Sequence, residues 1–414
     1  MSVEFYQKYF NYIGDTEAPL IYHRWCAVSI VAAILGRNVF LPFGHSRIYP
    51  NMYIMLEGNP GARKGTALRP ARNLLKGIEF AKLAPDRLSA ERFIAEMQLL
   101  NQPETIDGID FERLNFETPS EIYVMAAEFQ DFIGTANISF IVLLTNLWDN
   151  LDEYKHPKLH GKSIYVYAPT VNMIAAANQQ SIAQSLPIEA IGQGGTSRII
   201  FVHGESTGKQ ITFPKPVSQH AKKEIEATLT RIKNDLHGEI TISDKAKNLL
   251  DRVYKEYSYI DDFRFSHYNT RRFDHILKLC IVFAAMDVSL EVRETHVLQA
   301  NTLLHSTEQR MGKALGQFGK GKHSDVANAI IEFIKSNLTR NKRPATVREI
   351  WKQVDTNLNK FEELAEILRN LEAAEKIQIK EIAGRRGYVP LTKIMNGWKD
   401  DMLLKDFLFP EELP

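Results

Sequence analysis

Residues 58–66 have the residue types and spacing of a loop that binds the phosphates of a nucleotide. Such a loop directs successive backbone N–H groups at phosphate oxygens, and the helix that follows it adds partial positive charge. Gly58 and Gly61 permit the tight backbone, and Lys64 would reach the β- and γ-phosphates of ATP. The predicted nucleotide-binding residues are Gly58, Asn59, Pro60, Gly61, Ala62, Arg63, Lys64, Gly65 and Thr66.

The loop departs from the usual pattern at two positions. Arg63 stands where glycine is usual, and Gly65 stands where the Ser or Thr that holds Mg²⁺ is usual, so that Thr66 is displaced by one position. The alternative interpretation is an ordinary glycine-rich turn. The β-rich run 52–57 before the loop and the helical segment that starts near Thr66 favour a phosphate loop, because strand, loop and helix must follow in this order.

ATP hydrolysis also needs a carboxylate at the end of a strand, where it orients water and helps to hold magnesium. The apolar run 122–126 ends at Ala127 and Glu128, so the usual Asp-Glu pair is reduced to the glutamate. We predict that Glu128 activates water and that Thr66 and Glu128 bind Mg²⁺. Asp131 or water could also fill the place of the missing aspartate, or hydrolysis is slow. The alternative for Glu128 is a solvated carboxylate at the start of a helix.

Two further polar residues stand where a nucleotide site needs them. The buried run 171–177 ends at Asn178, whose amide would position the attacking water. The run 194–197 leads to Arg198 at a junction between loop and strand. An arginine there could reach the γ-phosphate bound by a neighbouring subunit, a role worth several orders of magnitude in rate. The alternative for Arg198 is a surface salt bridge.

The segments that must position these residues alternate between strands and helices. Apolar strands are predicted at 52–57, 121–125, 171–177 and 198–202. Helices are predicted at 88–100 and 137–152, and the first fifty residues are also predicted to be helical apart from a short strand at 37–41. The alternation predicts an α/β core in which helices cover both faces of a parallel sheet.

From about residue 216 the pattern changes to one of helices only. Helical periodicity is present at 219–235, 243–257, 270–287 and 293–315, with no convincing strand, so this region is predicted to be all-helical. The glycine- and lysine-rich run 312–322 is typical of a linker. Helices at 324–337, 346–353 and 360–374 and β runs at 377–382 and 388–391 then follow. Three helices and a hairpin, with a turn at 384–387, are the plan of a winged helix.

The order of these motifs resembles that of AAA+ P-loop ATPases of the minichromosome-maintenance helicase group. Residues 265–290 look like the helical lid of that group, in which an arginine at the position of Arg271 senses the nucleotide. Residues 292–301 fit the last helix of the lid, and a winged helix follows in both. The variant loop 63–66, with 49–53 before it, is similar to a family of phage and mobile-element primase–helicase ATPases. The resemblance covers roughly residues 15–390.

The resemblance also implies positions for contacts with DNA. In the minichromosome-maintenance group, a hairpin before the asparagine-bearing strand carries basic residues into a central channel. The matching stretch here is 154–162, in which the predicted DNA-binding residues are Lys155, Lys158, His160 and Lys162. The predicted wing offers Arg385 and Arg386 at a hairpin tip. The alternatives are a basic surface hairpin for the first stretch and a protein-interaction module for the second.

The predicted organisation has six parts. They are an N-terminal helical extension of the core at 1–50, the AAA+ core at 51–215, the helical lid at 216–312, a linker at 313–323, the winged-helix domain at 324–392 and a tail at 393–414. The tail sets acidic residues among leucines and phenylalanines. It resembles a docking peptide, although packing back on its own domain is the favoured interpretation.

Composition sets limits on the function. A net charge of +1 over 414 residues means that any contact with nucleic acid must come from local basic patches. Cys26 and Cys280 lie far apart in apolar runs, which is typical of buried thiols in a reducing compartment. There is no secretory signal pattern and no apolar run long enough to span a bilayer, so we expect a soluble protein without a membrane partner. The expected location is the cytoplasm, or the host cytoplasm if the chain is phage-encoded.

Together these features predict an ATP- and Mg²⁺-dependent DNA helicase that forms a hexameric ring in phage or mobile-element replication. Its expected partners are single-stranded DNA, further copies of itself, and a primase or replication-initiation protein. The sequence has no zinc-ligand cluster or acidic catalytic domain of a primase, so priming would need another chain. The alternative is a non-translocating AAA+ helicase loader or regulatory ATPase. A small-molecule kinase is disfavoured because it needs neither a winged helix nor an arginine acting on a neighbouring subunit.

Overall fold

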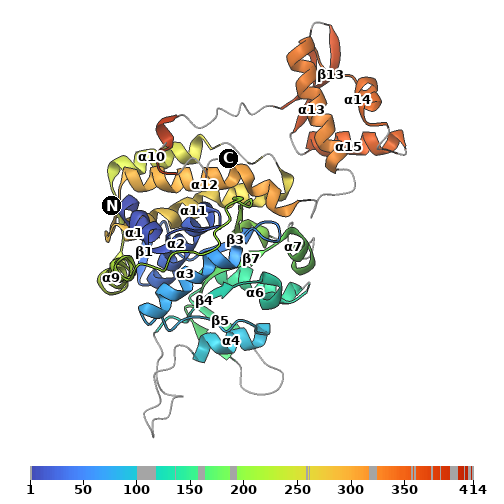
Figure 1. Ribbon diagram of the computed structural model, residues 1–414. Coiled ribbons are helices and arrows are strands. Elements are labelled where there is room, and N and C mark those ends of the chain that lie inside the picture. Colours follow the sequence, from blue (N-terminus) through green and yellow to red (C-terminus); the bar gives the residue numbers. More distant parts are fainter. Residues whose placement is uncertain are drawn as a thin grey trace. The chain divides into compact units, whose positions relative to one another are not determined.

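The computed structural model forms two compact units. One comprises Met1–Phe318 together with Trp398–Pro414, and the other comprises Gly319–Gly397 (Figure 1). The described residues are 2–99, 118–135, 137–156, 164–186, 194–257, 260, 262–316, 324–355, 358, 360–373, 376–382, 384–391, 400–404, 406–408 and 412.

A parallel sheet of four strands lies at the centre of the first unit. Its spatial order is β4–β7–β3–β8, formed by β3 (Tyr53–Glu57), β4 (Glu121–Ala126), β7 (Thr170–Ala177) and β8 (Ile199–His203). All neighbouring strands are parallel, so their carboxyl ends meet at one edge, here called the carboxyl edge, and their first residues meet at the opposite, amino edge. This confirms the predicted parallel sheet with flanking helices (Figure 1).

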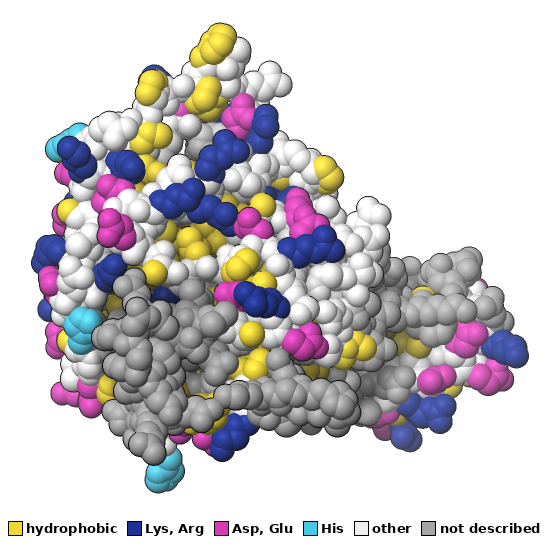
Figure 2. All heavy atoms as spheres, turned by 90° about the horizontal axis from the view of Figure 1, so that it is seen from below, with side chains coloured by type: hydrophobic (Ala, Val, Ile, Leu, Met, Phe, Trp, Pro, Cys, Tyr) yellow, Lys and Arg dark blue, Asp and Glu magenta, His cyan; other side chains and the backbone are white. Residues whose placement is uncertain are grey.

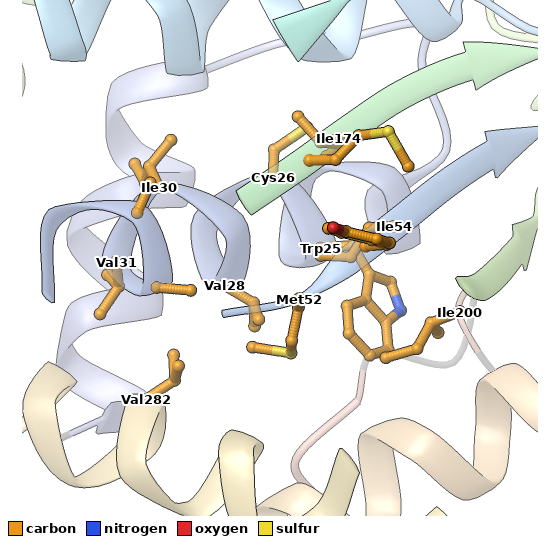
Figure 3. Close-up of a cluster of buried hydrophobic side chains, with 14 of the residues drawn as sticks. Trp25, Cys26, Val28, Ile30, Val31, Met52, Ile54, Ile174, Ile200 and Val282 are labelled. Carbon is orange, nitrogen blue, oxygen red and sulfur yellow. The ribbon is translucent and has the colours of Figure 1, made fainter. Parts of the chain in front are cut away.

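The sheet is buried between helices on both faces. Every residue from Ile21 to Leu35 in α2 (Leu20–Leu35) is buried, as expected for a helix that is apolar all round. Side chains of α2 lie beside Ile54 of β3 and Ile174 of β7 (Figure 3). The next side chain along β3 points to the other face, since strand side chains alternate, and there the Tyr53 hydroxyl donates to the Leu144 carbonyl of α6 (Ile138–Trp148).

The remaining elements of the first 200 residues flank this sheet or extend from it. The helices are α1 (Ser2–Ile13), α3 (Lys64–Gly77), α4 (Ala90–Leu99), α5 (Phe129–Ile133) and α7 (Gln179–Ser185). The additional strands form two antiparallel pairs, β1 (Val39–Phe43) with β2 (Ser46–Ile48) and β5 (Glu153–His156) with β6 (Ile164–Tyr167). The helix predicted at 137–152 ends earlier than expected, because Asp149 is its C-cap and Asn150 has a left-handed backbone with φ of 55°.

Four helices follow, and they confirm the helical periodicity beyond residue 216. They are α9 (Gln219–Asp235), α10 (Asp244–Lys255), α11 (Ser266–Met286) and α12 (Glu294–Leu315). The region is not all-helical, however: β9 (Gly238–Glu239) pairs with β1, and β10 (Thr241–Ile242) pairs with β11 (Glu291–Val292). Strands of two residues leave no alternating pattern in a sequence, which explains why they were not predicted. Residues of all four helices belong to the same hydrophobic core as the sheet.

The second unit has its own hydrophobic core, which includes Ile330, Ile350 and Leu364. Its elements are the helices α13 (Ser324–Asn341), α14 (Val347–Val354) and α15 (Phe361–Ala373) and the antiparallel strands β12 (Ile377–Ile382) and β13 (Arg385–Pro390). The predicted helices and hairpin are confirmed, but the turn is shorter than expected. Gly384 has φ of 73°, which allows the chain to reverse so tightly that Arg385 and Arg386 are already part of β13.

The C-terminal tail packs back on the first unit. Met402, Phe407 and Leu408 are buried in that unit's core. Glu412 accepts a hydrogen bond from Arg24 of α2 at 2.6 Å, and the Arg24 guanidinium lies 4.8 Å from the centre of the Phe407 ring. Among the residues that the structure describes, no helix combines the length and the hydropathy needed to span a bilayer.

Candidate active site

The loop 58–66 follows the carboxyl end of β3 and includes the first residues of α3, which begins at Lys64. Gly58 must be glycine, because an added Cβ would lie 2.5 Å from both the Gly204 carbonyl oxygen and the Tyr22 hydroxyl. Gly61 has φ of 90°, a conformation that favours glycine. Lys64 begins α3, and its Nζ donates back to the carbonyls of Gly58 at 2.6 Å and Asn59 at 3.3 Å. The loop is therefore tight, and its lysine stands at a helix N-terminus.

Arg63 occupies the position where the usual loop has glycine, and its backbone shows why glycine is favoured there. Its φ of 59° and ψ of 29° are left-handed, which costs a non-glycine residue about 1 kcal/mol. The guanidinium turns away from the loop to pair with Glu17 at 2.7 Å. Glu17 also accepts from the backbone N–H of Ile211 at 2.8 Å. The side chain at this unusual position therefore contacts Glu17, which in turn holds the backbone at Ile211.

Two carboxylates act on Lys64. Burial lowers the pKa of Lys64, and the nearby Glu128 and Glu57 oppose this shift. Glu128 follows β4 and lies exposed at the N-cap position of α5, where its side chain makes no capping hydrogen bond. The structure therefore places Glu128 near enough to Lys64 to oppose the lowering of its pKa by burial, and Glu128 is exposed at the start of α5.

Glu57 was not predicted, although it lies beside the loop. It is fully buried as the last residue of β3, and its Oε2 lies 2.6 Å from Nδ1 of His203, its partner in the register with β8. Its Oε1 is also buried and has no hydrogen-bond partner among the described residues. A glutamate that ends an otherwise apolar strand was the signal in the sequence. Its pairing with His203 depends on the strand order, which the sequence does not give.

Asn178 follows β7, the strand next to β3, and so lies at the carboxyl edge as predicted. Its side chain already has a structural role. Asn178 Oδ1 accepts from the backbone N–H of Ser181 at 2.8 Å, and the Ser181 hydroxyl accepts from the backbone N–H of Asn178 at 3.0 Å. This reciprocal capping box fixes the start of α7. The side-chain oxygen is thereby engaged, and its amide nitrogen is the group left to donate to a ligand.

Arg198 lies at the opposite edge of the sheet. It ends a short 3-10 helix (Thr196–Arg198) and precedes Ile199, the register partner of Tyr53 at the amino end of β3. Its side chain is buried and forms a salt bridge with a partly exposed carboxylate. With only 8% of the side chain exposed, its Nη2 donates to Asp149 Oδ2 at 2.5 Å and its Nη1 to the Gly194 carbonyl at 3.1 Å.

Arg271 meets Arg198 at the same carboxylate. It lies in the second turn of α11, and its Nη1 is 3.4 Å from Asp149 Oδ1. Both guanidinium groups also lie over the Trp148 indole, at 5.7 Å for Arg198 and 5.5 Å for Arg271. The sequence predicted both arginines but not Asp149 or Trp148, because it placed these two residues inside a longer helix.

A lysine also lies beside Trp148 and the two arginines. Lys278 of α11 is buried, its Nζ lies 4.3 Å from the centre of the Trp148 ring, and it donates to the Tyr49 carbonyl at 3.0 Å and to Asn51 Oδ1 at 2.5 Å. Burial lowers its pKa to about 7. We call Trp148, Asp149, Arg198, Arg271 and Lys278 the arginine cluster.

The β5–β6 hairpin also starts from the amino edge. The Tyr167 carbonyl at the end of β6 accepts from the N–H of Ser120, directly before β4. Lys155 is exposed, pairs with Glu153 at 3.0 Å and lies 5.7 Å from the centre of the Tyr165 ring. The other predicted DNA-binding residues, Lys158, His160 and Lys162, lie outside the described residues. On the face shown in Figure 2, side chains of both charges are interspersed among the described residues.

The predicted basic residues of the second unit are exposed on β13. Arg385 lies 3.2 Å from Glu349, which also accepts from Arg343 at 2.7 Å. Arg386 pairs in register with Glu381 on β12. Each arginine therefore has a carboxylate close by, which reduces the net positive charge of the hairpin.

Among the described residues, no group of three or more His, Cys, Asp and Glu side chains could hold a metal ion. Thr66 is exposed on α3, one residue after Gly65. A helix turns about 100° per residue, so Thr66 does not point where a side chain at position 65 would point. Mg²⁺ in nucleotide sites often has only one or two protein carboxylates and takes its other ligands from phosphates and water, so Glu128 alone could supply the protein carboxylate.

The two edges of the sheet thus carry different groups. Lys64, Glu128, Asn178 and Glu57 meet at the carboxyl edge, whereas the arginine cluster lies at the amino edge. Compared with known proteins, the chain matches no family model and no curated protein sequence.

Proposed function

We propose that this chain is an AAA+ ATPase that assembles into a homohexameric ring and acts as a DNA helicase or translocase in phage or mobile-element replication. The observation that carries this proposal is the separation of two complementary sets of charged groups by one sheet. The loop 58–66, with Glu128 near its lysine, lies at one edge, and two arginines lie at the other. Neither set alone would make an ATPase site, whereas together they would supply a lysine, a water-activating carboxylate and two arginines.

At the carboxyl edge, this chain's residues would bind ATP and prepare the water. The backbone N–H groups of the loop and Lys64 would hold the phosphates, and Glu128 would take a proton from the attacking water. The Asn178 amide nitrogen would orient that water, because Asn178 Oδ1 is already engaged in the cap of α7. Bound Mg²⁺, held by Glu128 and Thr66, would supply positive charge to the phosphates.

The arginines of one copy cannot serve its own phosphate loop. From Tyr53 to Glu57 the sheet measures roughly 13 Å, and the arginine cluster and the loop lie beyond its opposite ends. A head-to-tail interface would instead place the amino edge of one copy against the carboxyl edge of the next. Interfaces of this kind close into rings when the rotation permits. Arg198 and Arg271 would then act on ATP bound by the neighbour.

A mixing experiment tests this arrangement directly. Lys64→Ala and Arg198→Ala should each hydrolyse almost no ATP alone, because one lacks the loop lysine and the other the arginine. In an equal mixture, about a quarter of the interfaces would join an intact loop to an intact arginine, and roughly that fraction of the wild-type rate should return. No recovery at any mixing ratio would contradict a site shared between copies.

The matched control for that mixture is Lys64→Ala with Glu128→Gln. Both defects lie on the loop side of the site, so every interface in this mixture lacks one of the two groups. Activity should therefore stay near zero. Recovery of activity in this control mixture would mean that mixing restores activity without a site shared between copies. The recovery in the first mixture would then no longer support a shared site.

The alternative function is a non-translocating helicase loader or regulatory ATPase. The ion pair between Lys155 and Glu153 favours it, since it neutralises the only predicted DNA-binding residue of the hairpin that the structure describes. In this alternative, the second unit would be a winged helix that binds protein or duplex DNA. A translocase with a basic hairpin in its channel should lose DNA-stimulated hydrolysis in the double variant Lys158→Ala, Lys162→Ala and keep basal hydrolysis. Unchanged stimulation would favour the alternative.

A further inference from the structure

We infer that Asp149 occupies, within one copy of the chain, the place that the terminal phosphate of a nucleotide bound by the next copy would take. The inference rests on the proposed function and adds to it the group that the phosphate must displace. Asp149 Oδ2 accepts from Arg198 at 2.5 Å, and Oδ1 lies 3.4 Å from Arg271. Two guanidinium groups that hold the two oxygens of one anion are arranged as they would be to hold two oxygens of a phosphate.

The positive charges of the arginine cluster favour an anion that carries more negative charge than a single carboxylate. Arg198 and Arg271 face Asp149, and Lys278 lies across the Trp148 ring. Asp274 is a second carboxylate near these cations, and burial raises its pKa, which disfavours its charged form. Burial lowers the pKa of His275 to about 3, so the histidine is neutral at neutral pH. A terminal phosphate carries more negative charge than Asp149 and would therefore compensate the two arginines more fully.

The exposure of the side chains shows from which side a phosphate could arrive. The side chain of Asp149 is 41% exposed and that of Arg271 is 31% exposed, whereas that of Arg198 is 8% exposed. An incoming anion would thus meet Asp149 and Arg271 first and would reach Arg198 by taking the place of Asp149. Trp148 stays beneath them, because it is buried and its carbonyl accepts from Asn51 at 3.1 Å.

The position of Asp149 in the chain makes this exchange local. Asp149 is the C-cap of α6, and Asn150 then turns the chain towards the hairpin with a left-handed backbone. The Asn150 amide donates to Asn51 Oδ1 at 2.8 Å, so the residue after Asp149 is itself anchored. The exchange therefore requires the Asp149 side chain to move and leaves α6 in place. Until a loaded neighbour arrives, the carboxylate shields both arginines.

The test compares the nucleotide dependence of self-association in three chains. Asp149→Asn keeps the shape of the side chain but removes the charge that competes with phosphate. We expect this variant to assemble at about one tenth of the concentration of a slowly hydrolysed ATP analogue that the wild type needs, measured by sedimentation velocity. Asp251→Asn is the matched control, because Asp251 is an exposed carboxylate paired with Lys255 at 2.8 Å on α10. It should assemble as the wild type does.

A double variant assigns the effect to the arginines. Arg198→Ala combined with Asp149→Asn should lose the gain in assembly, since the charge freed by Asp149→Asn is largely that of Arg198. If Asp149→Asn does not fold, Asp149→Ser removes the same charge with a smaller side chain and should give the same shift. Thermal unfolding of each variant, followed by circular dichroism, identifies those that fold.

Two results would overturn the inference in distinguishable ways. If Asp149→Asn and Asp149→Ser fold and assemble at the wild-type nucleotide concentration, while Arg198→Ala still abolishes hydrolysis, the exchange is wrong and the shared ATPase site stands. If the wild-type chain neither binds the ATP analogue nor hydrolyses ATP, the proposed function fails and the exchange fails with it.

Discussion

The carboxyl and amino edges of the central sheet are built in different ways. At the carboxyl edge, the nine residues 58–66 are consecutive, and the other polar groups lie at or just after strand ends. Glu57 ends β3, Asn178 follows β7, and Glu128 comes two residues after β4. At the amino edge, Asp149, Arg198 and Arg271 come from three elements that are far apart in the sequence. Backbone donors for phosphate need a contiguous segment, whereas charged side chains can be assembled from any elements that the fold brings together. Variants that change one edge at a time test whether the two edges have different roles.

The largest effect is expected at the loop. Lys64→Ala removes the side chain that would bind the β- and γ-phosphates, and it should lower kcat/KM for ATP hydrolysis by about 100-fold or more. Lys76→Ala, on the exposed face of the same helix, is the matched control and should be near wild type. Phosphate release in the steady state measures both. A Lys64→Ala rate within a few-fold of wild type would show that the loop does not hold the reacting phosphates.

The buried pair behind the loop should give the next largest effect. Glu57→Gln replaces a charged partner of His203 by a neutral one in a fully buried position. We expect a loss of about 1–3 kcal/mol in the free energy of unfolding, measured with urea, and a loss of several-fold in ATP hydrolysis. The control is Glu224→Gln, since Glu224 is exposed and pairs with His220 at 3.6 Å on the surface of α9. If both variants were equally stable, the pair would not support the loop.

At the amino edge, Lys278 predicts a pH dependence. Burial lowers its pKa to about 7, despite the opposing charges of Asp274 and Asp149, whereas in the unfolded chain the pKa is near 10.5. Between these values the unfolded state binds more protons, so stability should rise as pH increases from 7, by on the order of 1 kcal/mol per pH unit. Lys278→Met should flatten that rise. An unchanged slope between pH 7 and 9 would show that Lys278 stays charged in the fold.

The smallest effect is expected from restoring the usual residue of the loop. A Cβ at Gly65 would meet nothing within 4 Å, so Gly65→Ser fits without strain. Because serine is the better helix former, it should stabilise the chain by about 0.5 kcal/mol. Its hydroxyl should also lower, by a few-fold, the Mg²⁺ concentration needed for half-maximal hydrolysis. Thr66→Ala tests the proposed ligand: a wild-type rate of hydrolysis in that variant would show that Thr66 does not bind Mg²⁺.

The sequence was most informative where a signal is local. Continuous apolar runs predicted the strands β3, β4 and β7, helical periodicity predicted the helices α9 to α12, and the structure confirms them. Residue order alone also placed Glu128 after one strand and Asn178 after another, and parallel strands bring such residues to one edge. The strand order could not be predicted in this way, because it depends on which faces of the helices are buried together.

The amino edge shows what local patterns leave out. Arg198 and Arg271 were predicted separately, but their common partner Asp149 was not, because apolar periodicity does not show where α6 stops. Glu57 was missed for a related reason: its relation to His203 exists only across two paired strands. Contacts between side chains that are far apart in the sequence cannot be predicted from the local sequence around each residue.

The return of the C-terminal tail to the first unit has a topological consequence. Since Trp398–Pro414 belongs to the same unit as Met1–Phe318, residues 319–397 form an insertion anchored at both ends. The buried ion pair between Arg24 and Glu412 helps to fix the second anchor. A unit tethered twice searches a smaller volume than one on a single linker, which raises its effective concentration near the body that holds it. One break in the backbone between the units would leave the two pieces associated through the tail.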